Sequence, residues 1–380
     1  MRLAFICSGL EPGRDGVGDY TRHLAAECVR QGHEVRLIAL NDRAAAVSEK
    51  AETQDSGGIP IPCERYSSQC LWPSRFEAAQ RAIKSFSPDC VCLQFVPYGF
   101  QPKGIPWFLA RGLARVIGGR PLAIMFHELW IGFGEGAPWK QRLVGAIQRR
   151  CIFGLLRRLR PGAVFTSNVT YATLLRQGGV EAVELPIFSN IPVVAHPTLP
   201  SPLIREGIST DPGERRRWLV GLFFGTIHPE WRASDLMDPL LSFAAREKRR
   251  VCLVSAGRLG SAGELAWAQM RTDYEGRAHF LCLGELPAPE ISDLMQTADF
   301  GVAVTPWRLM GKSGSAAAMI DHGLPVVFTR TEGAPDHDGP IFFRCGPGFG
   351  FPAGLARREP SARLGEICAR FIASLPLRSR

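Results

Sequence analysis

Short apolar runs alternate with segments of helical periodicity along this chain, and no other feature of the sequence restricts its fold as much. The first run is Leu3–Cys7, and a helical pattern over Asp19–Gln31 follows it. Apolar runs of this length predict strands buried on both faces, and helices between them predict a parallel sheet. The other elements predicted in this half are the strands Val35–Ala39, Cys90–Phe95, Leu122–Phe126 and Gly162–Thr166 and the helices Ala78–Phe86 and Pro138–Arg160.

The alternation stops at a proline-rich segment and then begins again. Five prolines interrupt the weakly periodic stretch between Pro186 and Glu214, which is typical of a linker. The sequence predicts two doubly wound, Rossmann-like α/β domains over 1–195 and 216–360, with the linker at 196–215, a closing helix within 361–380 and an interdomain cleft for ligands. The elements predicted after the linker are the strands Leu219–Phe224, Val251–Ser255, Phe280–Leu283, Phe300–Val304 and Pro325–Thr329 and the helices Ala233–Ala245, Pro289–Gln296, Ser315–His322 and Ser361–Ser374.

The composition favours a reduced, cytoplasmic protein. A chain of 380 residues suggests about two domains, and the first apolar run is too short for a signal peptide. No apolar run reaches the roughly 18 residues that a transmembrane helix needs. Five of the eleven cysteines lie inside predicted strands, so we expect buried thiols and no structural metal. These five are Cys7, Cys90, Cys92, Cys252 and Cys282.

Basic residues are concentrated in one region, within a net charge of +9. From Lys103 to Arg160 the only acidic residues are Glu128 and Glu135. This asymmetry indicates an anionic partner: a membrane surface, a phospholipid-linked substrate or a nucleic acid. The helix Trp139 to Arg160 also carries leucines and isoleucines, which fits peripheral membrane contact at an inner membrane surface. An ordinary amphipathic helix is the alternative, and nucleic acid is disfavoured because aromatic residues are not interleaved with the basic ones.

A glycine-rich turn late in the chain is the strongest candidate for binding an anion. Within Met310–Thr329, the turn runs into a helix of small residues. Backbone N–H groups, a helix N-terminus and a lysine together suit a diphosphate. The candidate binding residues are Lys312, Ser313, Gly314 and Ser315. The alternative is a tight turn whose alanines are needed only for close packing.

Two further candidates follow strands of the predicted sheets. Gly225 and Thr226 end the first strand of the second half, with Arg232 after them, an arrangement suited to phosphate; Gly257 ends the next strand. His127 and Glu128 follow Leu122–Phe126 and are candidates for acid–base chemistry or sugar contacts. A simple helix start and a loop-paired histidine are the respective alternatives.

The loop that contains Gly16 and Gly18 is the last candidate. A dinucleotide fingerprint would need a third glycine where the chain has Thr21, so a Rossmann cofactor site is disfavoured. The loop can instead bring backbone amides into the cleft, so Gly16 and Gly18 are candidates for binding the donor; alternatively, its glycines serve turn geometry alone. Asp336 and Asp338 form an Asp-x-Asp pattern, which we interpret as a solvated turn rather than a metal site.

In order and spacing, these segments resemble the GT-B glycosyltransferases, closest to glycosyltransferase family 4. The resemblance rests on Gly16–Ala25, Arg30–Arg36, the Gly284 turn followed by Ala298-Asp299, and Gly323-Leu-Pro-Val-Val. It implies transfer of a sugar from a nucleotide diphosphate donor to a saccharide or lipid-linked acceptor, without a cofactor or metal and with retention. It also implies that the second domain binds the donor and the first binds the acceptor.

The resemblance is incomplete at the donor site. The family usually carries two glutamates eight positions apart, and this chain has Met310 and Ala318 there. The family's Arg and Lys after the first strand of the second domain fall at Thr226 and Trp231. Asp321 and Glu230 are candidate replacements. A catalytically silent GT-B domain that binds a glycan or protein partner is therefore the second hypothesis, and a dinucleotide-dependent oxidoreductase is the third.

Overall fold

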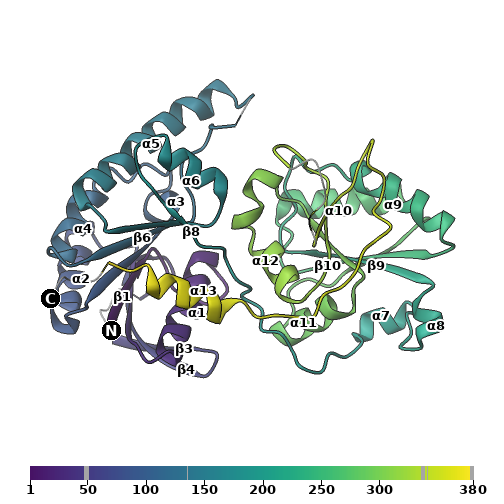
Figure 1. Cartoon of the computed structure of the whole chain (residues 1–380), viewed down its shortest axis with the longest axis horizontal. Helices are drawn as coiled ribbons and strands as arrows, with labels where there is room; N and C mark the ends of the chain where they lie inside the picture. The colour runs from purple at the N-terminus through teal and green to yellow at the C-terminus, as the bar shows by residue number, and fades with distance from the viewer. Residues whose placement is uncertain (47–50, 135, 335–338, 340, 377–380) are drawn as a thin grey trace. The chain divides into compact units, whose positions relative to one another are not determined.

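A computed structural model describes residues 1–46, 51–134, 136–334, 339 and 341–376. The chain forms two compact units: Met1–Pro186 together with Leu364–Arg380, and Ile187–Arg363. Figure 1 shows that each unit is a sheet with helices on both faces. Asp336 and Asp338 of the Asp-x-Asp pattern lie outside the described residues.

The first unit is built on an eight-stranded sheet in the order β3-β4-β2-β1-β5-β6-β7-β8. Only β3 is antiparallel to its neighbour. The chain places β2 on one side of β1 and then β5 on the other, so the direction of strand addition reverses between β1 and β5. The strands are β1 Arg2–Cys7, β2 Glu34–Asp42, β3 Ala51–Ser56, β4 Ile59–Ser67, β5 Cys90–Phe95, β6 Leu122–Phe126, β7 Ala163–Thr166 and β8 Val183–Glu184.

Seven helices in the described residues cover this sheet, and one of them comes from the far end of the chain. That helix, α13, lies beside α1 (Figure 1). Its Phe371 stacks on Phe5 of β1 at 5.8 Å and contacts Phe165 of β7 at 5.3 Å, measured between ring centroids. The helices are α1 Gly16–Arg30, α2 Trp72–Phe86, α3 Pro97–Phe100, α4 Leu109–Ile117, α5 Trp139–Leu159, α6 Val169–Arg176 and α13 Leu364–Ala373.

The second unit is built on a six-stranded parallel sheet in the order β11-β10-β9-β12-β13-β14. The direction of strand addition reverses between β9 and β12. In doubly wound sheets, ligands bind at the carboxyl ends of strands beside such a reversal. The strands are β9 Trp218–Phe224, β10 Arg250–Ala256, β11 His279–Cys282, β12 Phe300–Ala303, β13 Val326–Phe328 and β14 Phe342–Arg344.

Apolar clusters attach helices to both faces of the second sheet. Helices α9 and α10 pack on one face through Leu240 and Trp267. Helices α7, α11 and α12 pack on the other through Leu203, Leu294 and Met319. The helical elements are α7 Ser201–Arg205, α8 Pro212–Arg215, α9 Ser234–Arg246, α10 Ser261–Asp273, α11 Ala288–Thr297, the 3-10 helix η1 Trp307–Lys312 and α12 Gly314–Asp321.

The units divide the chain differently from the sequence analysis in two respects. The boundary is at Pro186 rather than at 195, and residues 196–215 are part of the second unit rather than a free linker. They are attached because Leu203 is buried in the core of that unit and Arg215 pairs with Asp299 at 3.0 Å. The closing helix, predicted within 361–380, belongs to the first unit because Phe371 is buried against its sheet.

One local prediction is wrong, and one pair of strands was not predicted. Cys282 is exposed rather than buried, because it ends β11, the edge strand of its sheet. The hairpin β3–β4 was not predicted, since β3 is polar and Pro60 and Pro62 interrupt β4. Prolines inside a run normally argue against a strand. The predicted strands are all present; Cys90–Phe95 and Leu122–Phe126 have the predicted ends, and the ends of the others are shifted.

Candidate functional site

A cavity of about 340 Å³ lies at the carboxyl ends of the strands of the second unit. Its walls come from the ends of β9 and β12, the two strands between which the sheet reverses. The N-terminal residues of α10 and α12 complete it. Two helix N-termini thus meet at the position where a doubly wound sheet binds its ligand.

The polar groups that line this cavity suit an anion. Five side chains carry hydroxyl groups, one carries an imidazole, and none of the lining residues is acidic. Hydroxyl and backbone N–H donors beside the positive ends of two helix dipoles attract phosphate groups. The lining residues with polar side chains are Thr226, His228, Ser261, Thr305, Ser313 and Ser315.

The predicted residues Ser313, Gly314 and Ser315 form the start of α12. The Ser313 side chain caps the helix by accepting from the Ala316 N–H at 3.3 Å. Gly314 is the first helical residue, and Ser315 lines the cavity. A helix therefore begins here because serine supplies its N-cap, and the same start leaves Ser315 at the cavity wall.

Gly225 and Gly257 shape the turns next to this cavity. Both have left-handed backbones, with φ of 84° and 85°. A Cβ atom on Gly257 would lie 3.4 Å from the Gly225 nitrogen, so the two turns approach closely. The Gly225 N–H already donates to Ala256 O and the Gly257 N–H to Gly284 O. These glycines provide the turn geometry, and their amides are engaged within the protein.

The cationic groups near the cavity differ from those expected. Arg232 is exposed and is not among the lining residues. Arg330, which follows β13, places its guanidinium 3.2 Å from His228 Nδ1 and 2.8 Å from a Glu230 carboxylate oxygen. Burial lowers the pKa of His228, and the charges of Arg330 and Lys312 lower it further. Arg330 and Lys312 do not line the cavity either, but their charges act on His228, which does. The sequence analysis did not single out Arg330.

The positions that carry glutamates in the family are apolar and buried. Met310 and Ala318 are 6% and 1% exposed and belong to the core of the second unit. Asp321 is 2% exposed; it pairs with Arg363 and accepts from the Ser189 N–H at 2.9 Å. Because these contacts occupy its carboxylate, Asp321 is structural. Glu230 is 71% exposed and pairs with Arg330, so it is the remaining acidic candidate.

In the predicted loop of the first unit, Gly18 is at a position where only glycine fits. A Cβ atom there would lie 2.6 Å from the backbone oxygen of Gly9. Gly16 begins α1, and Asp15 caps that helix by accepting from the Val17 N–H at 3.0 Å. Asp15 also bonds the Gly18 amide. A carboxylate of the protein therefore already occupies the N-terminus of α1.

A cavity of about 730 Å³ lies beside this loop, where the first sheet reverses between β1 and β5. Asp42, in its wall, is 1% exposed and pairs with Arg65 at 2.8 Å. Hydroxyl, amide and carboxylate groups of this kind can bind the hydroxyl groups of a saccharide. The lining residues with polar side chains are Ser8, Glu11, Arg14, Asp15, Asn41, Asp42, Arg43 and Tyr98.

His127 and Glu128 follow β6, as predicted, but His127 is buried. Its Nε2 lies 2.8 Å from Gln94 Oε1, and Tyr20 packs edge-on against its ring at 4.8 Å. Burial lowers the pKa of His127 to about 3, so the imidazole is neutral at pH 7. Glu128 is half-buried and has partners in the structure. The geometry makes His127 a neutral hydrogen-bonding group rather than a proton carrier at neutral pH.

We expect the buried imidazole to make the protein sensitive to mild acid. The unfolded chain binds a proton at His127 below about pH 6.5, whereas the folded protein does so only near 3. Stability from this group is therefore full above pH 6.5 and is lost as the pH falls toward 3, with about 2 kcal/mol lost at pH 5. Urea denaturation at pH 7 and pH 5 measures it. His127→Gln should show a smaller pH dependence; an identical dependence would contradict the assignment.

The sequence of the first unit matches a known family. Residues 15–191 match the model described as "Glycosyl transferase 4-like domain". The match covers just under half of the chain, which is similar over these residues to that domain. The match covers α1, β5 and His127 but not β1, and it ends near the boundary of the first unit at Pro186. No curated protein sequence matches the chain.

Solved structures share the fold over nearly the whole chain. Sucrose-phosphate synthase from Thermosynechococcus elongatus has a TM-score of 0.55 at 12% identity, covering 98% of this chain and 90% of that one. Anabaena HepE in complex with UDP and glucose has a TM-score of 0.54 at 16% identity, with the same coverage. UDP-GlcNAc 2-epimerase from Methanocaldococcus jannaschii has a TM-score of 0.52 at 9% identity, covering 98% and 99%.

Together these findings show that the chain has the GT-B fold of two Rossmann-like units and that its first unit is similar to a glycosyltransferase domain. Within the described ranges, no three His, Cys, Asp or Glu side chains are grouped as metal ligands. In the same part of the chain, none of the helices has the length and hydrophobicity of a bilayer-spanning segment.

Proposed function

We propose that this protein transfers a sugar from a nucleotide diphosphate donor and that the second unit binds the donor diphosphate. The observation that carries this proposal is the cavity between β9 and β12, where two helix N-termini converge and no lining residue is acidic. HepE, with the same fold, was solved with UDP and glucose. The proposed donor contacts are Thr226, Ser313, Gly314, Ser315, Lys312 and Arg330, with Gly225 and Gly257 shaping the turns.

In the proposed transfer, negative charge develops on the departing diphosphate, and the protein must stabilise it. Donors fixed in place before the reaction stabilise such charge without reorganising. The N–H groups of α10 and α12, with the fields of Arg330 and Lys312, supply that stabilisation in this proposal. Neither a cofactor nor a metal is assigned a step, and retention of configuration is the outcome that the family resemblance implies.

The first unit binds the acceptor in this proposal, through the cavity between β1 and β5. Its carboxylates and amide suit saccharide hydroxyl groups, so the proposed acceptor is a saccharide or a lipid-linked glycan. Gly16 and Gly18 hold the α1 loop that forms its wall. His127 and Glu128 are proposed to contact the sugar, with His127 acting as a neutral hydrogen-bonding group because of its low pKa.

A catalytically silent nucleotide-sugar or glycan-binding protein is the second candidate. Met310 and Ala318 favour it, because apolar side chains fill the positions where the family has carboxylates. The two candidates differ in turnover. Transfer or hydrolysis of a nucleotide sugar supports the enzyme, and tight binding without turnover across a panel of sugars and acceptors supports the silent protein.

The donor site is tested with two arginine variants. We expect Arg330→Ala to weaken binding of a nucleoside diphosphate by about 1.5–3 kcal/mol, the contribution of one charge-assisted hydrogen bond, or about 10- to 150-fold. Arg232→Ala removes the same charge from an exposed residue outside the cavity and should leave binding unchanged. Isothermal calorimetry with UDP and ADP measures both. If only Arg232→Ala lost affinity for nucleoside diphosphates, the donor site would have to lie near Arg232 instead. If the native protein bound no nucleoside diphosphate, the proposal would be refuted.

We further propose a cytoplasmic protein that contacts the inner membrane surface through Trp139 to Arg160. The exposed apolar residues Trp139 and Leu143 and the arginines of α5 support this assignment. An amphipathic helix of this composition binds anionic lipid surfaces. We do not propose a nucleic acid as a partner.

A further inference from the structure

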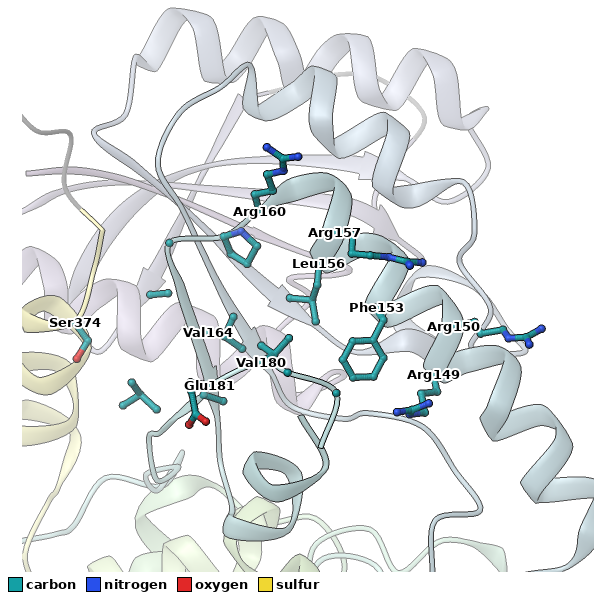
Figure 2. A pocket seen from close by; sticks show the side chains of 17 residues that line it. Arg149, Arg150, Phe153, Leu156, Arg157, Arg160, Val164, Val180, Glu181 and Ser374 are labelled. Carbon is teal, nitrogen blue, oxygen red and sulfur yellow. The ribbon is translucent and has the colours of Figure 1, made fainter. Parts of the chain in front are cut away.

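A groove on the first unit lies apart from the two cavities described above. It has a volume of about 1300 Å³ and lies between the C-terminal half of α5, the start of β7 and the loop that leads into β8 (Figure 2). We call it the arginine groove, after Arg149, Arg150, Arg157 and Arg160 in its wall. Because it adjoins the amino end of β7, it is separate from the cavity at the carboxyl ends of β1 and β5.

The charge of the arginine groove is strongly positive. Four arginines line it with a single carboxylate, Glu181. That carboxylate pairs with Arg176 at 3.2 Å instead of with the groove arginines. Basic residues are favoured at a helix C-terminus, which explains Arg157 at the end of α5. Arg149 and Arg150 lie more than two turns before the end of α5, so the helix dipole does not explain why these positions are basic.

The floor of the groove is apolar. Figure 2 shows Phe153, Leu156, Val164 and Val180 close together, with the labelled arginines around them. Phe153 packs tightly over the backbone, since a Cβ atom on Gly178 would lie 2.0 Å from its ring. The Arg149 guanidinium lies 5.0 Å from the centroid of the same ring. A ligand in this groove would meet guanidinium groups at the rim and hydrocarbon below.

The same face of α5 continues beyond the groove as an apolar stripe. Trp139, Leu143 and Ile147 are spaced by four residues and are 70%, 58% and 42% exposed. Arg150 and Arg157 follow at spacings of three and seven, which keeps them on that face of the helix. One helix therefore presents apolar side chains in its first half and arginines in its second half along a single line.

We propose that the arginine groove and this face of α5 bind the phosphate headgroups of an acidic phospholipid surface. The inference rests on the membrane contact in the proposed function and names its lipid class and its binding residues. Guanidinium groups bind phosphate at two points, and the apolar floor accepts the first methylene groups of the chains. A free phosphate would leave the floor exposed to water, and a nucleic acid would lack aromatic stacking platforms.

Vesicle sedimentation of the full chain tests this proposal. The variant Arg150→Gln/Arg157→Gln changes the groove, and Arg111→Gln/Arg115→Gln removes the same charge from exposed positions on α4. Vesicles of phosphatidylcholine with about one third phosphatidylglycerol carry the headgroup charge. We expect about fivefold weaker binding for each groove arginine lost, hence about 25-fold for the pair, and a change within about threefold for the control pair. Vesicles of phosphatidylcholine alone should bind poorly.

Three results would overturn the inference: equal binding to both kinds of vesicle, an equal loss in the α4 control pair, or tight binding of soluble glycerol phosphate that the groove variant abolishes. The last would indicate a site for a free phosphate ester. Thermal unfolding confirms that each variant is folded. UDP and ADP binding without vesicles separates the two proposals, because the groove variant should keep it and Arg330→Ala should keep vesicle binding.

Discussion

Ser315→Asp should abolish donor binding while the protein stays folded. Ser315 lines the cavity at the second position of α12, where a carboxylate is favoured by the helix dipole. The same carboxylate would repel a bound diphosphate, and two like charges about 4 Å apart near a protein surface repel by about 4 kcal/mol. We therefore expect at least about 100-fold weaker binding of UDP or ADP by calorimetry, with an unchanged or higher melting temperature.

Ser315→Asn is the matched control, since it has nearly the same shape without the charge. It should weaken binding by about tenfold or less, the contribution of one neutral hydrogen bond. Native affinity in Ser315→Asp would show that the diphosphate binds elsewhere. Loss of affinity together with a lower melting temperature would indicate a folding defect, and that result would not support the site.

Arg363→Ala should strongly destabilise the second unit. Its guanidinium pairs with Asp321, which is 2% exposed, and also donates to Ile187 O at 3.3 Å. Removing one partner of a buried pair leaves an uncompensated charge and costs about 3–5 kcal/mol. Because the Arg363 side chain is 27% exposed, water relieves part of this cost, and we expect a loss of about 2–4 kcal/mol in urea denaturation.

Arg217→Ala is the control for this variant. Arg217 pairs with Glu214 in the same unit, but both side chains are more than half exposed, at 69% and 53%. Exposed pairs contribute little, so we expect a change within about 0.5 kcal/mol. Hydrogen exchange should localise the effect of Arg363→Ala to α12 and its neighbours. Equal stability of the two variants would show that the pair of Asp321 with Arg363 does not stabilise the second unit.

The sequence predicted the strands that are buried along their whole length. Strands such as Leu219–Phe224 and Cys90–Phe95 are buried on both faces, so nearly all of their residues are apolar or small and the pattern is visible. The hairpin β3–β4 was not predicted, because β3 is polar along its length although Gln54 and Ser56 are buried. The unit boundary was also missed, since the burial of Leu203 depends on a core whose other members lie far along the chain.

The residues of the candidate site also differ in how well the sequence predicts them. Gly225, Thr226, Ser313 and Ser315 line one cavity, and the sequence could single them out because strand ends and helix starts are local signals. Arg330 was missed because its relation to His228 spans 102 positions and arises only when β13 joins the sheet. Arg232 was favoured because it follows β9 closely. In the structure the Trp231 side chain enters the core against Phe223, at 5.3 Å, and the next residue faces solvent.

The return of α13 to the first unit affects the order in which a ribosome can complete the two halves. The second unit is one continuous segment, so its core can form as soon as Ile187–Arg363 has emerged. Phe5 and Phe165, which are fully buried, lack their contact with Phe371 until residues 364–373 follow. The half that is translated first is therefore finished last, and its nascent sheet has an open apolar face that a chaperone can bind during synthesis.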